Sequence, residues 1–206
     1  MCDCTDLLAR ITMKLSEIAY LQSGLVLNRK EANTSKETVK TYHRLNLRSL
    51  NEDGTIDHAQ LDVFYSKAVI DSNMLTHEND IVLKLFVPMN PTLILSEDEG
   101  LVIPSQLAVV RVRDNRILPS FLCYWLSTPR AMEFILLHEG WQSQRAIKIS
   151  VMEDVDVPIL PLEKQKMISE TVSLQKKRNN LYRMLMEEEN KRTSLIIQQA
   201  IGGKRK

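Results

Sequence analysis

The side chains of this 206-residue chain that could do chemistry outside a core are basic, amide and hydroxyl groups placed between short apolar runs. Such groups make bidentate hydrogen bonds to base edges and bind phosphates. We therefore predict a nucleic-acid contact set of Arg44, Arg48, Lys84, Asn90, Ser105, Gln106, Gln142, Ser143, Gln144, Arg145 and Lys148. Each residue taken alone also fits an ordinary surface or turn position, so the prediction rests on the set.

Sequence motifs of familiar enzymes are missing. The six glycines have neither the GxGxxG nor the GxxxxGK spacing of phosphate-binding loops. GxSxG, HExxH and paired CxxC motifs do not occur either. We predict a protein that is not an enzyme and that has no catalytic residue, metal site or cofactor of its own. An enzyme with an unfamiliar site is an alternative, and a strongly shifted pKa of a carboxyl or histidine in an apolar pocket would reveal it.

Charge is balanced overall but segregated along the chain. The net charge of +1, from 27 basic and 26 acidic residues, excludes a generic polycation that coats nucleic acid. Residues 29–48 carry six basic and two acidic side chains, whereas residues 51–80 carry seven acidic side chains and one lysine. This pattern fits one face that binds an anion, and it equally fits solvated loops of opposite sign.

The elements that must position these side chains form an α+β domain over residues 1–160. Short apolar or β-branched runs alternate there with Asp-Gly, Asn-Pro and Glu-Gly breaks, which predicts strands and hairpins. We expect a strand over 45–50 followed by a tight turn, and a strand over 108–112 that is buried on both faces. Two helices follow, with a break at 127–128 and Ser120 as the cap of the first.

From Pro161 the chain has no glycine and no further proline for about forty residues, which predicts one long helix over 161–201 and a short basic tail over 202–206. At 1.5 Å per residue this helix is about 60 Å long, more than the domain needs for its own core. Its apolar side chains form a wide band of Ile168, Val172, Leu174, Leu181, Tyr182, Leu185, Met186, Leu195 and Ile196. We predict that this band pairs as an antiparallel coiled coil and makes a homodimer.

The apolar runs are all shorter than the 18 or so residues that span a bilayer, so no membrane segment is expected. Three cysteines are an odd number, and a disulfide framework is not expected. These features predict a cytoplasmic protein.

The order of four segments resembles the specificity subunits of type I restriction-modification systems. Residues 14–24 are similar to the family's opening strand and glycine. Residues 75–85 are similar to its strand with a Gly-Asp-Ile motif, in which Asn79 replaces the glycine. Residues 118–147 are similar to its signature of a proline, an aromatic helix, a glycine, a polar run and an isoleucine. The most specific match is 155–168, which carries the family's Pro-Leu-x-x-Gln box and the start of its helix.

This resemblance implies a half-length specificity subunit with one target-recognition domain, residues 1–160, and one conserved helix. The domain would bind one half of a bipartite site in double-stranded DNA. The helix would be a spacer and a dock for methyltransferase and restriction subunits, and S-adenosylmethionine and ATP would be bound by those partners only. The main alternative is a protein that uses the helix for assembly and does not bind DNA.

Overall fold

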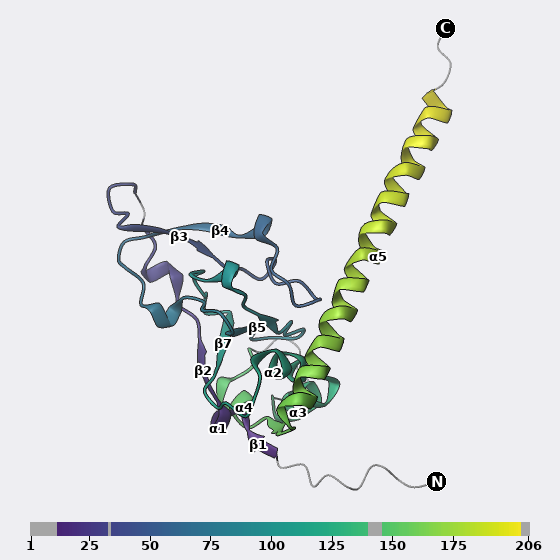
Figure 1. Cartoon of the computed structure of the whole chain (residues 1–206). Coiled ribbons are helices and arrows are strands. Elements are labelled where there is room, and N and C mark those ends of the chain that lie inside the picture. Colours follow the sequence, from purple (N-terminus) through teal and green to yellow (C-terminus); the bar gives the residue numbers. More distant parts are fainter. Residues whose placement is uncertain (1–11, 33, 140–145, 203–206) are drawn as a thin grey trace, which may run out of the picture. The chain divides into compact units, whose positions relative to one another are not determined.

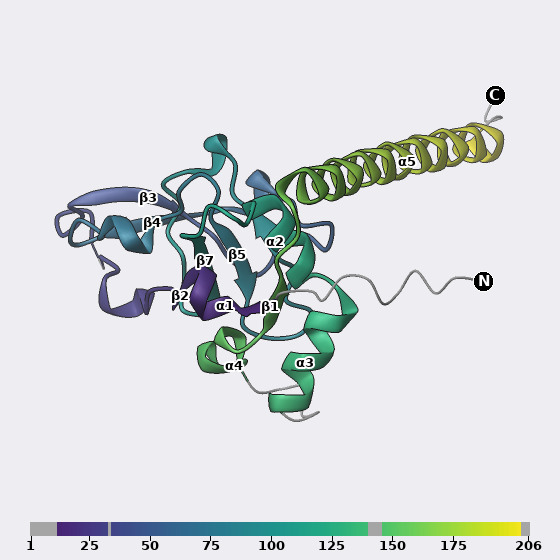
Figure 2. The same cartoon turned by 60° about the horizontal axis from the view of Figure 1, so that its bottom comes forward.

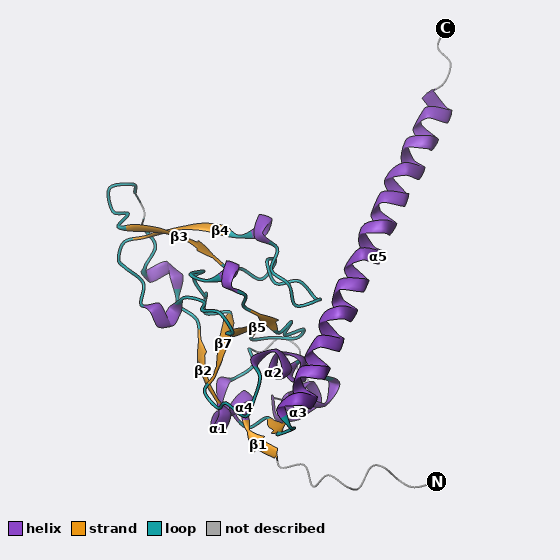
Figure 3. Cartoon of the chain, in the orientation of Figure 1, coloured by secondary structure: helices purple, strands orange, loops and turns teal. Residues whose placement is uncertain are grey.

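The computed structural model describes residues 12–32, 34–139 and 146–202 (Figure 1). The chain divides into two compact units, residues 1–166 and residues 167–206. All the strands of the described residues lie in the first unit, and the second unit is formed by a helix, so the predicted α+β class is confirmed (Figure 3).

An antiparallel sheet of four strands organises the first unit. Its order is β2 (Ala19–Ser23), β7 (Leu107–Val112), β5 (Ile81–Lys84) and β6 (Thr92–Leu93). The inner strand β7 contains the apolar run that predicted a strand buried on both faces. Its side chains alternate between two core clusters, with Ala108 and Val110 in one and the neighbouring Leu107 and Val109 in the other. This prediction is confirmed.

Helices cover one face of this sheet. The cluster that contains Ala108 and Val110 also includes side chains of α1 (Leu15–Ile18), α2 (Pro119–Leu126), α3 (Pro129–Glu139) and α4 (Ile149–Glu153). A two-stranded sheet of β1 (Thr12–Lys14) and β8 (Asp156–Pro158) lies beside them. We call this side of the sheet the helical face.

Loops cover the other face, which we call the loop face. Its core cluster combines Leu107 and Val109 with Leu45, Leu50 and Ile103. The hairpin of β3 (Lys40–Arg44) and β4 (Asp62–Ser66) belongs to a third cluster and lies on the opposite side of the sheet from α3 and α4 (Figure 2). The short 3-10 helices are η1 (Leu27–Arg29), η2 (His58–Gln60), η3 (Ser72–Met74) and η4 (Ser96–Asp98).

The strand expected over 45–50 is wrong, although the tight turn that follows it is present. The side-chain oxygen of Asn46 accepts hydrogen bonds from the backbone N–H groups of Arg48 and Ser49, both at 2.9 Å. This local bonding folds the segment into turns in place of a strand. The expected strand pairing is reduced to one isolated bridge between Leu50 and Ile56.

The two helices expected after Leu118 are confirmed, and so is the break between them. The cap is different, because α2 begins at Pro119 with Leu118 in the cap position and Ser120 already inside the helix. Proline is favoured at the first helical position, where its fixed φ suits the helix and its missing N–H costs nothing.

The predicted long helix is confirmed as α5 (Leu162–Gly202). The apolar residues predicted to form a band are more than half exposed from Leu174 onward, whereas Ile168 and Val172 are partly buried. No helix in the described part of the chain is long and apolar enough to cross a membrane.

Candidate nucleic-acid interface

Residues of the sequence motifs hold the scaffold of the first unit together. Gly24 ends the first motif, and a Cβ there would collide with the backbone carbonyl oxygens of Ile103 and Pro104. Asn79 has φ of 68°, in the left-handed region that glycine adopts freely and asparagine tolerates better than most residues. The residue types at these two positions are explained by backbone geometry: a close approach at Gly24 and a positive φ at Asn79. Neither residue is needed for ligand contact, so the candidate contact surface lies between the motifs.

A third motif residue, Asp80, is also structural. Its carboxylate is almost fully buried and binds the Arg111 guanidinium in a bidentate pair, with Nε at 3.0 Å from Oδ1 and Nη2 at 3.1 Å from Oδ2. The same guanidinium donates to the carbonyl of Leu75 at 2.7 Å. The pair therefore ties the start of β5 to β7.

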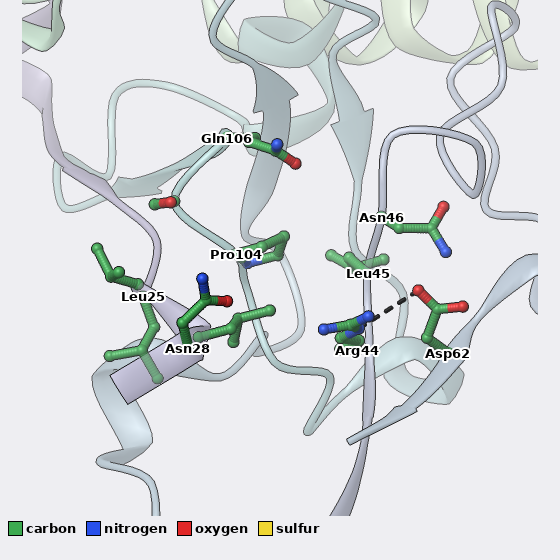
Figure 4. Close-up of a pocket in the computed structure, with 11 residues that line it drawn as sticks. Leu25, Asn28, Arg44, Leu45, Asn46, Asp62, Pro104 and Gln106 are labelled. Atoms are coloured by element: carbon green, nitrogen blue, oxygen red, sulfur yellow. Dashed lines mark hydrogen bonds and ion pairs between the residues drawn. The ribbon is translucent and has the colours of Figure 1, made fainter. Parts of the chain in front are cut away.

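The first unit has a recess of about 330 Å³, which we call the Arg44 pocket (Figure 4). Three segments that are far apart in the sequence frame it: residues 25–28, 44–46 and 104–106. Backbone bonds hold them together, because Ser105 N–H donates to Leu25 at 2.9 Å and Leu45 N–H donates to Val102 at 3.0 Å. The pocket is lined by Leu25, Val26, Leu27, Asn28, Arg44, Leu45, Asn46, Asp62, Pro104, Ser105 and Gln106.

Three residues of the predicted contact set, Arg44, Ser105 and Gln106, thus line one pocket. Two side chains that the sequence did not single out, Asn28 and Asn46, join them. The pocket offers amide, hydroxyl and guanidinium groups in one recess, and these are the groups that read base edges. No local signal marked the two asparagines, because their place beside Arg44 depends on pairing between distant segments.

An ion pair with Asp62 positions the Arg44 guanidinium. Nε of Arg44 lies 3.3 Å from Oδ2 of Asp62, and the two side chains are 28% and 36% exposed. The guanidinium carbon also lies 6.0 Å from the centre of the Phe64 ring, within reach of a cation–π interaction. A partly exposed pair of this kind contributes about 1 kcal/mol or less, so an incoming anion or base edge can compete for Arg44.

Three more predicted residues lie around the core cluster of the loop face, to which Leu45 of the Arg44 pocket also belongs. Arg48 is exposed in the turn between Leu45 and Leu50, both of which belong to that cluster. The side-chain amide of Asn90 donates to the carbonyl of Leu50 at 3.4 Å. Lys84 lies at the end of β5, two residues after Val82 and therefore on the same face.

Burial lowers the pKa of Lys84, and the nearby Glu52 carboxylate partly opposes this effect. A phosphate placed beside the ammonium would act in the same direction as Glu52 and would favour the charged form. Contact with an anion at Lys84 would therefore oppose the effect of burial on this pKa.

Lys148 lies apart from the predicted contact residues around the Arg44 pocket and the loop-face cluster. It is the residue before α4, on the helical face of the sheet, where its carbonyl accepts the first backbone bonds of that helix. Gln142, Ser143, Gln144 and Arg145 lie outside the described residues.

A lysine group that the sequence did not single out lies at one end of the β3–β4 hairpin. Lys67 N–H donates to the carbonyl of Lys30 at 3.0 Å, and Lys40 pairs with Ser66 in the hairpin register. All three lysines are exposed. Lys67 stands alone in the acidic stretch of the sequence, so its charge joins the basic stretch only through the fold.

One arrangement of titratable side chains bears on the alternative of an unfamiliar enzyme site. Oγ of Ser72 lies 3.0 Å from Nε2 of His77, whose Nδ1 lies 3.6 Å from Oδ2 of Asp80. This resembles a catalytic triad in composition, but 3.6 Å is too long for the histidine–carboxylate hydrogen bond of a triad, and the carboxylate is bound by Arg111. Within the described residues, no group of three or more His, Cys, Asp or Glu side chains could hold a metal ion.

The fold is that of the specificity subunits of type I restriction-modification systems, which confirms at the level of the fold the resemblance noted in the sequence. The HsdS subunit from Thermoanaerobacter tengcongensis matches with a TM-score of 0.64 and 17% identity over 92% of this chain and 47% of that chain. A solved structure that addresses complex assembly and conformational transition of the type I R-M system matches with a TM-score of 0.66 and 15% identity, over 92% and 48%.

The S subunit of a type I restriction-modification system from M. genitalium matches with a TM-score of 0.50 and 12% identity, over 87% of this chain and 42% of that chain. The chain thus spans about half the length of these solved structures. A scan of protein-family models and a search of curated proteins find no match to the sequence.

Proposed function

We propose that the chain is a sequence-specific DNA-binding specificity subunit of a type I restriction-modification system, and that its domain of residues 1–160 recognises one half of a bipartite site. The observation that carries the proposal is the Arg44 pocket, which gathers base-reading groups on a unit with the specificity-subunit fold. The chain acts by binding and has no catalytic residue, metal or cofactor of its own.

Different residues have different roles in this proposal. Arg44, Asn46 and Gln106 in the pocket supply paired donors and acceptors for base edges. Arg48, Lys84, Asn90, Ser105 and Lys148 are proposed contacts as well, and so are Gln142, Ser143, Gln144 and Arg145. The exposed lysines Lys30, Lys40 and Lys67 are suited to phosphate contacts, which add affinity without sequence preference.

The partners follow from the same proposal. Residues 161–201 pair with a second copy to make a homodimer, and the helix also docks methyltransferase and restriction subunits, which bind S-adenosylmethionine and ATP. Its exposed apolar band supports pairing, because an isolated helix in water does not keep so much apolar surface solvated. We place the protein in the cytoplasm with its DNA.

Selection of bound duplexes from a random library by the full chain tests the function. We expect an enriched sequence whose halves are related by two-fold symmetry, since two identical domains read the same bases in reversed orientation. Co-purification of a methyltransferase subunit from the native cytoplasm would support the partner proposal. Failure to retain any duplex even at low salt would contradict the proposal and favour the alternative of a helix-mediated assembly protein.

A further inference from the structure

A regular seam runs along the exposed part of α5. Its ten positions alternate at spacings of four and three residues, which is the a/d pattern of a coiled coil. They are Met167, Thr171, Leu174, Arg178, Leu181, Leu185, Glu188, Arg192, Leu195 and Gln199. Leu181 and Leu185 are 65% and 57% exposed, so the apolar centre of the seam is open in the single chain.

Three charged residues interrupt the seam, and they restrict how a second copy can pair with it. In a parallel two-fold dimer every residue lies opposite its own copy. Arg178 would then lie opposite another arginine and Glu188 opposite another glutamate, each inside the interface. Like charges in such positions are destabilising, so the sequence disfavours the parallel arrangement.

We propose that a second copy pairs antiparallel with its two-fold axis at residue 183. This inference rests on the proposed homodimer and adds its register. Arg178 then lies opposite the partner's Glu188, and Leu181 lies opposite the partner's Leu185. The symmetry repeats each contact, so the centre of the interface has two leucine layers flanked by two opposite-charge layers.

Charge outside the seam supports the same register. The three residues 176–178 are all basic and the three residues 187–189 are all acidic. An axis at residue 183 brings each basic run level with the partner's acidic run, within the distance over which charges interact at physiological salt.

A competing register has its axis at residue 190. It also forms an opposite-charge layer, between Glu188 and the partner's Arg192. However, it overlaps the seam only from Leu181 to Gln199, whereas the axis at 183 uses all ten positions from Met167 to Gln199. More apolar surface is buried in the longer overlap, which favours the axis at 183.

In the single chain Glu188 already binds Lys191, with Oε1 and Nζ 2.6 Å apart. Both side chains are about two-thirds exposed. A surface pair three residues apart on one helix adds little stability, so it does not prevent Glu188 from pairing across the interface.

Cysteine crosslinking of the full chain tests the position of the axis. Tyr182 flanks the proposed axis on the interface side, whereas Arg183 lies on the outer side of the helix at almost the same level. In a background with Cys2 and Cys4 replaced by serine, Tyr182→Cys should crosslink to its own copy with a short bis-maleimide. Arg183→Cys is the matched control and should not. Efficient self-crosslinking of Glu189→Cys without that of Tyr182→Cys would place the axis at 190 and overturn the proposal.

Charge exchange provides a second measurement. Arg178→Glu and Glu188→Arg should each weaken dimerisation by about tenfold or more, and the double variant should recover most of the loss. The helix content of each variant, measured by circular dichroism, is the control for folding and should equal that of the wild type. A wild-type chain that is monomeric by mass would contradict the homodimer and the register together. A dimeric wild type in which the double variant is no better than the single variants would overturn the register alone.

Discussion

The carboxamide oxygen of Gln165 accepts a hydrogen bond from the backbone N–H of Leu118 at 2.8 Å. Its nitrogen donates to the carbonyls of Arg116 and Leu160, both at 2.7 Å. Gln165 is fully buried, and it is the glutamine of the Pro-Leu-x-x-Gln box. The box therefore fixes the first turn of α5 to the loop that precedes α2.

Replacing Gln165 by leucine should destabilise the first unit by about 2–4 kcal/mol. The substitution keeps a similar size but leaves a buried N–H and two carbonyls without these partners, and each such loss is costly. Urea unfolding followed by circular dichroism measures the change. Asn190→Leu, on the outer side of the same helix seven residues after Arg183, is the control and should stay within about 0.5 kcal/mol of the wild type. Equal midpoints for the two variants would show that the three bonds add nothing.

Asp98 should make stability depend on pH. Burial raises the pKa of its carboxyl above the ordinary value of 3.8, and a hydrogen bond from Leu95 N–H and the nearby His58 partly oppose the rise. A raised folded pKa means that the folded state holds the proton more tightly than the unfolded state. The stabilisation is therefore complete below the ordinary pKa and is lost as the pH rises through the folded pKa.

The variant Asp98→Asn removes this titration and keeps an oxygen that can accept from Leu95. The free energy of unfolding of the variant minus that of the wild type should be larger at about pH 7 than at about pH 4. The reason is that only the wild type ionises a buried carboxyl over that range. Urea midpoints at the two pH values give the comparison. Glu163→Gln, at an exposed position, is the control and should show a much smaller difference. A pH response of Asp98→Asn that parallels the wild type would refute the assignment.

The two kinds of proposed DNA contact should respond differently to mutation. Arg44→Ala removes a base-reading group and should reduce discrimination between preferred and altered sites by about 1–3 kcal/mol. Lys84→Ala should weaken binding to all sequences alike and lower the slope of log affinity against log salt by about one. Binding titrations on a preferred and an altered duplex at several salt concentrations separate the two effects.

Arg130→Ala, at an exposed arginine outside the proposed contact set, is the control for that experiment and should leave both quantities unchanged. Unchanged preference in Arg44→Ala, with the fold and dimer intact, would remove the Arg44 pocket from the recognition surface. The lysine group of Lys30, Lys40 and Lys67 would then be the next surface to test.

The sequence predicted elements that depend on local chemistry and missed features that depend on distant pairing. The long helix follows from a glycine-free stretch, and the central strand from its continuous apolar run. The expected strand over 45–50 failed because one side chain, Asn46, bonds its own turn. The pocket required Leu25 to pair with Pro104 and Arg44 with Val102, and no local pattern encodes pairings across so many residues.

Truncation should separate the assembly helix from the fold of the first unit, provided that Gln165 is kept. A chain ending at Thr171 retains this glutamine and its three hydrogen bonds but loses eight of the ten seam positions. We expect it to be monomeric, with a urea midpoint close to that of the full chain at low protein concentration, where dimerisation adds little stability.

A chain ending at Leu160 also lacks the seam, but it should be less stable by an amount similar to the effect of Gln165→Leu. Light scattering and urea unfolding of the two truncated chains make the comparison. A dimer that persists in the chain ending at Thr171 would show that assembly occurs through the first unit and would rule out the helix as the assembly element.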